Sequence, residues 1–135
     1  MPQEVTMDHV AIAVRSLAQA LPVYRDVLGL RHEGSEEVAS QGVATAFLDA
    51  GHVHIELLEP LSPDSPVGRF IESRGEGIHH VAFRVPDAQA ALDEARRQGL
   101  RLIDEHPRPG SRGLLIGFVH PKGTNGVLVE FCQQP

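Results

Sequence analysis

Residues 7–14 read Met-Asp-His-Val-Ala-Ile-Ala-Val, and residues 78–85 read Ile-His-His-Val-Ala-Phe-Arg-Val. Four of the eight positions are identical, and one of them is a histidine, His9 in the first copy and His80 in the second. Alternation of apolar and other side chains is typical of a β-strand. The sequence therefore predicts that the chain is built from two related halves, each beginning with a strand.

Each copy of this stretch is followed by a segment with the end signals of a helix. The first segment begins at Ser16 and ends before Gly29, and the second begins at Asp87 and ends before Gly99. Serine and aspartate are preferred N-cap residues, and glycine is preferred just after the last helical turn. We expect a helix in each half, the first one bent at Pro22, because proline removes a backbone hydrogen bond.

Both halves then end in an apolar strand with a glutamate at its centre. Residues 54–58 read His-Ile-Glu-Leu-Leu, and residues 128–132 read Leu-Val-Glu-Phe-Cys. The histidine of each repeat precedes this glutamate by 47 residues in the first half and by 50 in the second. Because the two matches occur in the same order, the sequence indicates two tandem β-α-β-β-β modules and an α+β fold.

The length and the 41% apolar content suit one compact domain over residues 1–135. We expect the first module at about residues 6–60 and the second at about 77–133. A short linking helix is expected at about residues 65–74, since Ser65 is a good cap and proline suits the first helical position. The modules are expected to form one curved, half-open mixed sheet around a metal cavity.

Strand alternation predicts which way the repeated side chains point. The histidine and glutamate of each half lie opposite the bulky residues that would pack on the helices, and alanines follow both histidines on their own face. Small side chains at these places indicate a cavity. The residues that would face it are His9, Ala11, Ala13, Glu56, His80, Ala82 and Glu130.

Two carboxylates on apolar strands cost several kcal/mol to bury without a partner, and a divalent cation offsets that cost. A lone histidine or glutamate on a strand is usually structural, but two matching pairs favour a metal site. We therefore predict that His9, Glu56, His80 and Glu130 bind one divalent ion. Two imidazoles and two carboxylates suit Co²⁺, Mn²⁺, Ni²⁺, Fe²⁺ or Zn²⁺, whereas Ca²⁺ prefers oxygen ligands only.

Composition excludes several classes of function. A formal net charge of −6 argues against nucleic-acid binding, which needs a basic surface. No apolar stretch approaches the ~18 residues of a membrane span, and the N-terminus lacks the features of a signal peptide. A single cysteine, Cys132, excludes an internal disulfide and fits a reducing compartment, so we expect a cytoplasmic protein with a buried Cys132.

From Met7 to Glu130 the chain resembles the methylmalonyl-CoA epimerases of the vicinal oxygen chelate (glyoxalase) superfamily. The opening strand and the closing glutamate strand are similar to the superfamily in general. More specific are residues 56–66, Glu-Leu-Leu-Glu-Pro-Leu-Ser-Pro-Asp-Ser-Pro, and the double histidine of residues 79–80. By strand alternation His79 points away from the predicted metal site, and we interpret it as structural.

The resemblance implies that His9, His80 and Glu130 bind the metal, with Glu56 at a position that is Gln or Glu in the family. It implies epimerisation of methylmalonyl-CoA at C2 by proton abstraction and return through a metal-stabilised enediolate, with Glu130 as a candidate base. An acyl-CoA substrate and a homodimer are implied in the same way. Arg112 and Lys122 are candidate contacts for the substrate or for the phosphates of CoA.

The chain departs from part of this family at the second base. Some epimerases carry a glutamate in the strand after a Gln-Gly-Val motif, which is here residues 41–43, and the matching position is Thr45. A neutral threonine is a poor base near neutral pH. The sequence therefore assigns no residue to the second proton transfer.

Three other functions stay open. Lactoylglutathione lyase (glyoxalase I) uses the same His, Glu, His, Glu order and also moves a proton. An extradiol-type dioxygenase needs two histidines and one carboxylate on iron, and a fourth ligand at Glu56 would crowd the oxygen site. A metal-free binding protein would hold a small molecule in the same cavity.

Overall fold

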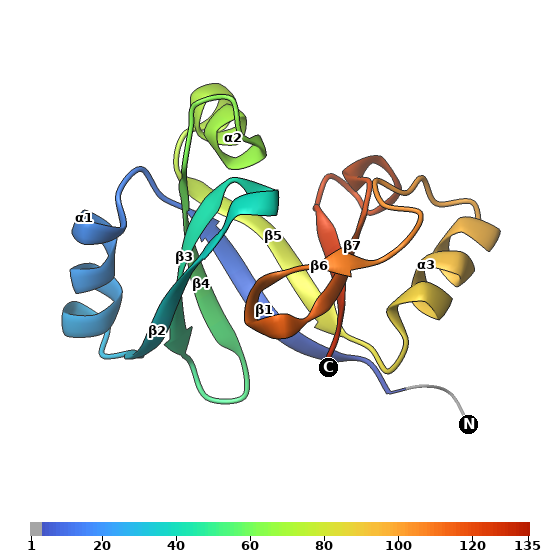
Figure 1. Ribbon diagram of the computed structural model, residues 1–135, viewed down its shortest axis with the longest axis horizontal. Coiled ribbons are helices and arrows are strands. Elements are labelled where there is room, and N and C mark those ends of the chain that lie inside the picture. The colour runs from blue at the N-terminus through green and yellow to red at the C-terminus, as the bar shows by residue number, and fades with distance from the viewer. Residues whose placement is uncertain (1–3) are drawn as a thin grey trace. The chain divides into compact units, whose positions relative to one another are not determined.

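The computed structural model describes residues 4–135, which form two compact units (Figure 1). One unit holds residues 9–79, and the other holds residues 4–8 and 80–135. Each unit combines strands with helices in the predicted β-α-β-β-β order, so the α+β class is confirmed. The predicted linking helix belongs to the first of these units.

The unit of residues 9–79 contains a four-stranded array in the order β2-β3-β4-β1. Neighbours pair antiparallel except β1 and β4, which run parallel. The strands are β1 Thr6–Ala13, β2 Arg31–Val38, β3 Val43–Asp49 and β4 His54–Pro60. A parallel pair requires a long crossover connection, which α1, β2 and β3 supply here.

The first helix begins where the sequence predicts and changes character at its proline. The α-helix α1 spans Leu17–Pro22, and the side chain of Ser16 caps it by accepting a hydrogen bond from the N–H of Gln19. Beyond Pro22 the chain continues as a π-helical turn, η1 Val23–Val27. The expected bend is therefore a wider helical turn. In it the N–H of Leu28 donates a hydrogen bond to the carbonyl oxygen of Val23, five residues earlier.

Helices cover both faces of this array. Ile12, Ile55 and Leu57 pack with the apolar side of α1, whereas Ala11 and Leu58 belong to a cluster with the second helix, α2 Pro66–Arg74. The strand alternation expected from the sequence is therefore confirmed. Within this unit, however, the alanines that follow His9 do not line an open space, because α2 packs against them.

The predicted cap of α2 is also confirmed. Ser65 accepts a hydrogen bond from the N–H of Gly68 at 3.1 Å, with Pro66 in the first turn. A Cβ added to Gly68 would lie only 2.5 Å from the carbonyl oxygen of Ser62. The close approach of α2 to the preceding loop therefore requires a glycine at that position.

The second unit repeats the arrangement in the order β5-β8-β7-β6. Here β5 and β8 run parallel and the other neighbours antiparallel. Its elements are β5 Gly77–Arg84, α3 Ala88–Arg97, β6 Arg108–Pro109, β7 Leu115–Val119 and β8 Val129–Gln133, with 3-10 turns η3 Ser111–Gly113 and η4 Pro121–Gly123. The strand β6 has only two residues, so the second module is less regular than the first.

The α3 helix packs closely on its sheet. Asp87 caps it by accepting a hydrogen bond from the N–H of Ala90, as the sequence predicts. Leu92 is completely buried, in one cluster with Val129 and Phe131. A Cβ on Gly117 of β7 would lie 2.7 Å from a methyl carbon of Leu92, so this glycine lets the helix approach.

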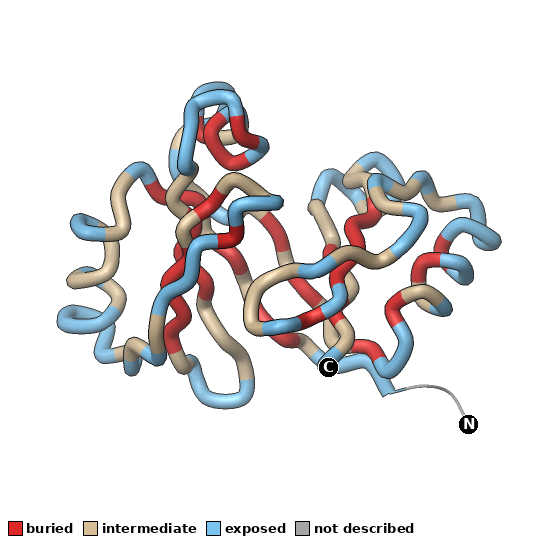
Figure 2. Tube along the Cα trace, viewed as in Figure 1, coloured by how far each residue is buried: buried red, intermediate tan, exposed pale blue. Residues whose placement is uncertain are grey.

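Buried residues lie mainly on the strands of both units. Figure 2 shows them along the strands and on one side of α2 and α3, whereas α1 contains only intermediate and exposed residues. None of the helices formed by residues 4–135 has the length and apolar character needed to span a membrane.

Candidate metal centre

In the unit of residues 9–79, a histidine and a glutamate form a buried pair. His9 lies on β1 and Glu56 on the adjacent β4, with His9 Nδ1 3.3 Å from Glu56 Oε2. Only 2% of His9 and 3% of Glu56 is exposed. The register of the two parallel strands sets this geometry, because Glu56 lies opposite Ala11, two residues after the histidine.

The second unit contains the matching pair. His80 lies on β5 and Glu130 on the adjacent β8, with His80 Nε2 3.8 Å from Glu130 Oε1. Both residues are buried, with 5% and 3% exposed. Glu130 lies opposite Ala82, again two residues after the histidine. The sequence repeat is therefore also a repeat of strand register.

A phenylalanine stands beside each carboxylate in the same register. Phe47 of β3 lies opposite Glu56, and Phe118 of β7 lies opposite Glu130. The ring of Phe118 also meets the imidazole of His80 edge to face, with ring centroids 5.1 Å apart. These aromatic partners were missed in the sequence analysis, although both lie on a strand next to a predicted ligand.

The donor types and their burial fit a divalent cation. A carboxylate removed from water beside an aromatic ring is costly unless it faces positive charge. An imidazole donates a nitrogen lone pair to a metal only when neutral, and a carboxylate supplies oxygen. The structure thus brings the four predicted ligands together as two pairs, one in each unit. That both pairs bind the same ion remains a prediction.

The histidine that precedes His80 has a different environment. His79 lies on β5, and its ring meets Phe70 of α2 edge to face, with centroids 5.0 Å apart. Burial lowers the pKa of His79 from 6.5 to about 4, because it disfavours the charged imidazolium. His79 is therefore neutral at physiological pH and packs against a helix, which fits the structural role expected from strand alternation.

Asp8, a buried acidic residue next to His9, was not identified as a candidate from the sequence. Asp8 is almost fully buried, and its two carboxylate oxygens accept hydrogen bonds from Arg84 at 2.9 Å and from Arg112 at 2.6 Å. A carboxylate inside an apolar strand requires such a counter-charge, and that requirement is a signal that the sequence does contain.

The two predicted substrate contacts occupy different settings. Arg112 lies in η3 with a φ of 55° and forms an ion pair with Asp8. Lys122 lies in η4 with an exposed side chain, and its backbone N–H donates to Nδ1 of His120. The role of either residue in binding a substrate remains a prediction.

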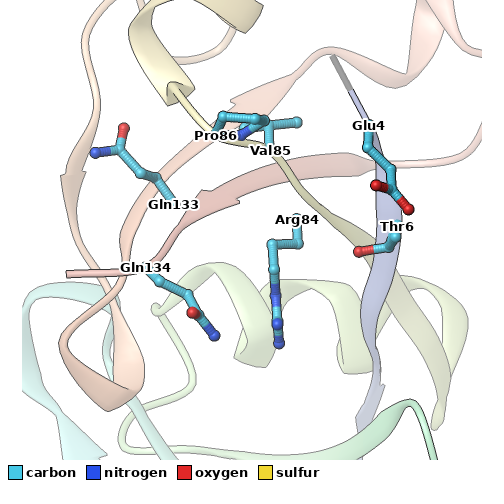
Figure 3. A pocket seen from close by; sticks show the side chains of 7 residues that line it. All are labelled: Glu4, Thr6, Arg84, Val85, Pro86, Gln133 and Gln134. Carbon is cyan, nitrogen blue, oxygen red and sulfur yellow. The ribbon is translucent and has the colours of Figure 1, made fainter.

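Arg84 also borders a surface pocket of about 390 Å³ in the second unit (Figure 3). The pocket is lined by Glu4, Thr6, Arg84, Val85, Pro86, Gln133 and Gln134. None of the predicted metal ligands belongs to this lining.

Cys132 is buried, as expected, and its Sγ donates a hydrogen bond to the carbonyl oxygen of Phe83 at 3.4 Å. Burial raises the pKa of its thiol well above its usual range, and the negative charges of Asp8 and Glu130 add to this effect. The thiol is therefore a packing group in the cluster with Ala82 and Phe118.

Comparison with known proteins places this geometry in a family. A family model described as the Glyoxalase/Bleomycin resistance protein/Dioxygenase superfamily matches residues 8–118. An uncharacterized protein of Bacillus subtilis is 46% identical over 127 residues, which are 94% of this chain and 91% of that protein. The ethylmalonyl-CoA/methylmalonyl-CoA epimerase of Cereibacter sphaeroides is 38% identical over 129 residues, 94% of this chain and 96% of that enzyme. The chain belongs to the methylmalonyl-CoA epimerase family.

A solved structure supports the same assignment for this epimerase family member. A methylmalonyl-CoA epimerase in complex with methylmalonyl-CoA and NH4+ superimposes with a TM-score of 0.90 at 37% sequence identity. The match covers 95% of this chain and 93% of that one. The epimerase family consists of isomerases, so the chain is assigned to this class of enzyme and its vicinal oxygen chelate fold is confirmed.

Proposed function

We propose that the protein epimerises methylmalonyl-CoA at C2 with the help of one divalent ion bound by His9, Glu56, His80 and Glu130. The observation that carries the proposal is the repeated register, in which each glutamate lies opposite the alanine two residues after each histidine. Membership of the epimerase family supplies the reaction. If one ion takes two of its ligands from each half of the chain, each half must supply an equivalent pair of donors.

The proposed ligand set is chemically consistent with Co²⁺, Mn²⁺, Ni²⁺, Fe²⁺ or Zn²⁺. Four protein donors on a six-coordinate ion leave positions for substrate oxygens. A bound ion would supply positive charge beside the oxygens on which negative charge develops when C2 loses its proton. His9 and His80 would bind as neutral imidazoles, and their buried positions would keep water away from the reacting carbon.

Glu130 is the proposed base on one side of C2. The C2 proton is acidified by the thioester and by the carboxylate that flank this carbon, and a carboxylate oxygen of Glu130 would accept it. The electron pair of the C–H bond would move into the thioester carbonyl. Return of a proton to the opposite side of the carbon would complete the inversion.

Lactoylglutathione lyase is the principal rival, because it shares the order of the four ligands. The Pro-Leu-Ser-Pro-Asp-Ser-Pro run at residues 60–66 and the double histidine at residues 79–80 favour the epimerase. In the structure the run forms the loop and cap that lead into α2, and His79 packs against Phe70 of the same helix. The run therefore determines where α2 begins, and His79 contacts that helix through Phe70.

The proposed function is tested by hydrogen–deuterium exchange at C2 of methylmalonyl-CoA in heavy water, with and without a chelator. We expect exchange and epimerisation with the purified protein, loss of both after chelation, and recovery when a divalent ion is added back. The hemithioacetal of methylglyoxal and glutathione serves as the competing substrate. Turnover of the hemithioacetal without C2 exchange would replace the proposal with the lyase, and activity unaffected by chelation would remove the metal from it.

A further inference from the structure

An arginine at the edge of the second unit shares a face of the sheet with two of the proposed metal ligands. Arg108 of β6 lies opposite Ile116 of β7, and Phe118, two residues further along β7, lies opposite Glu130 of β8. Residues directly opposite each other in antiparallel strands project to the same side, as do residues two apart on one strand. Arg108 therefore lies on the side of the sheet that carries Glu130, and His80 meets the ring of Phe118 on that side.

Phe118 connects this arginine with the histidine. The guanidinium carbon of Arg108 lies over the ring, 5.7 Å from its centroid. The imidazole of His80 meets the same ring edge to face, with centroids 5.1 Å apart. A guanidinium group is attracted to the face of an aromatic ring. A single ring therefore separates the positive charge from the imidazole, and all three residues belong to one unit.

The guanidinium group is held in place by Asp104. Oδ1 of Asp104 accepts a hydrogen bond from Arg108 Nε at 3.0 Å, and Oδ2 accepts one from the backbone N–H of Phe118 at 2.9 Å. Only 14% of the Asp104 side chain is exposed. Because both oxygens of this carboxylate are bound, Asp104 fixes the orientation of Arg108 over the ring.

The outer end of Arg108 is available to a ligand. A guanidinium group has five N–H donors, and the hydrogen bond to Asp104 uses only the one on Nε. Within residues 4–135 the two Nη atoms donate no hydrogen bond, and 37% of the side chain is exposed. The planar edge formed by the Nη atoms suits the two oxygens of a carboxylate or a phosphate, which accept two parallel hydrogen bonds.

We propose that Arg108 binds an oxyanion of the acyl-CoA substrate, with Asp104 as its positioning residue; this inference rests on the proposed function. Methylmalonyl-CoA carries two kinds of oxyanion, the carboxylate on C2 and the phosphates of CoA. Either kind accepts hydrogen bonds from the Nη atoms while Asp104 accepts from Nε and the ring of Phe118 supports the plane of the group. The contact anchors the substrate on the face of the sheet that carries His80 and Glu130.

The test measures the dissociation constants of three ligands by isothermal titration calorimetry. Methylmalonyl-CoA carries both kinds of oxyanion, propionyl-CoA lacks the carboxylate, and methylmalonyl-pantetheine lacks the phosphates. Each ligand is titrated into the purified wild-type protein and into each variant. Thermal melting of the variants establishes that they fold.

Two substitutions of Arg108 are compared with one control. Arg108→Gln removes the positive charge, whereas Arg108→Lys keeps a charge beside Asp104 but lacks the planar pair of Nη donors. Arg96→Gln is the matched control, because Arg96 is an exposed arginine of α3 in the same unit. That helix packs on Val129 and Phe131, on the opposite face of the sheet from Arg108.

We expect Arg108→Gln to raise the dissociation constant of methylmalonyl-CoA by about 10-fold or more, the usual effect of losing a hydrogen bond between charged groups. Arg108→Lys should fall between this variant and wild type. If the anion is the carboxylate, the loss also appears with methylmalonyl-pantetheine and is absent with propionyl-CoA. If the anion is a phosphate, the loss appears with both CoA esters and is absent with methylmalonyl-pantetheine. Either selective pattern supports the proposal, and Arg96→Gln should bind all three ligands like wild type.

Equal losses for all three ligands would give Arg108 a structural role only, and unchanged binding would remove it from the site. Both results overturn the inference and leave the proposed function standing. If Arg108→Gln does not fold, the same comparison of Arg108→Lys with wild type decides between these outcomes. A wild-type protein that binds methylmalonyl-CoA without exchanging its C2 proton would overturn the proposed function alone, and one that binds none of the three ligands would overturn both.

Discussion

The carboxylate of Asp8 accepts a 2.6 Å hydrogen bond from Arg112, a residue 104 positions further along the chain. Asp8 also accepts a hydrogen bond from Arg84. One buried carboxylate of β1 therefore connects this strand to the end of β5 and to the turn η3. The positive φ of 55° at Arg112 is unfavourable for a side chain with a Cβ. The ion pair is therefore one of the interactions that keep this turn in place.

Asp8→Ala should lower the free energy of unfolding by about 3 kcal/mol, because the guanidinium groups of Arg84 and Arg112 lose the carboxylate with which they both pair. Urea denaturation measures the effect. Glu94→Ala on α3 is the control, since its ion pair with Arg97 is exposed to solvent and should contribute little to stability. Equal small losses in both variants would show that the buried ion pair contributes no more than a surface pair.

Gly117→Ala should destabilise the protein by about 1–3 kcal/mol, because the added methyl group meets Leu92 at 2.7 Å. Leu92→Ala alone should cost about 2–5 kcal/mol by leaving a cavity. In the double variant the methyl group of residue 117 fills part of that cavity, so the combined loss should be smaller than the sum of the single losses. Strict additivity in a double-mutant cycle would contradict the close packing of α3 on β7.

The free energy of unfolding should fall as the pH is lowered from about 6.5 to about 4, in part because of His79. In the unfolded chain this imidazole becomes protonated near its usual pKa of 6.5, whereas burial keeps it neutral in the folded protein down to about pH 4. The unfolded state therefore binds more protons in this window, and the folded state loses stability, by at most about 3 kcal/mol from this group.

Two variants isolate this contribution. His79→Phe keeps an aromatic ring against Phe70 but cannot bind a proton, so its stability should depend less steeply on pH than that of wild type. His52→Gln, which replaces an exposed histidine of the same unit, is the matched control for the loss of an imidazole. If His79→Phe shows the wild-type slope, His79 does not remain neutral in the folded protein.

Cys132 should not react with iodoacetamide in the folded protein, because only a thiolate attacks and burial raises the pKa of this thiol. Mass spectrometry should show complete modification in urea and little without it. Rapid modification of the native protein would mean that the cluster around Ala82 opens readily to solvent.

Much of the architecture could be predicted from the sequence, because strand alternation and helix caps are local. The repeated histidine and glutamate predicted two related halves, and the structure shows the same parallel pairing of the histidine strand with the glutamate strand in both units. Ser16 and Asp87 cap the helices as expected, since a cap depends on residues only three positions away.

Features that depend on distant parts of the chain were not predicted. The pairing of Asp8 with Arg112 follows from the folded positions of two segments that no local pattern links. The packing of α2 over Ala11 likewise depends on tertiary structure, and it replaces the open space that small side chains suggested. The shortness of β6 could have been predicted from the sequence. Pro107 and Pro109 interrupt that segment, and proline cannot donate a backbone hydrogen bond to a neighbouring strand.

In the proposed site both histidine–glutamate pairs bind the same ion. The most direct measurement is the metal content of the purified protein and of the variants His9→Ala and His80→Ala, with their folding checked by circular dichroism. We expect one divalent ion per chain in the wild-type protein and loss of that ion from each variant, because each substitution removes a ligand from the same site. Two ions per wild-type chain, or a full complement of metal in either variant, would contradict it.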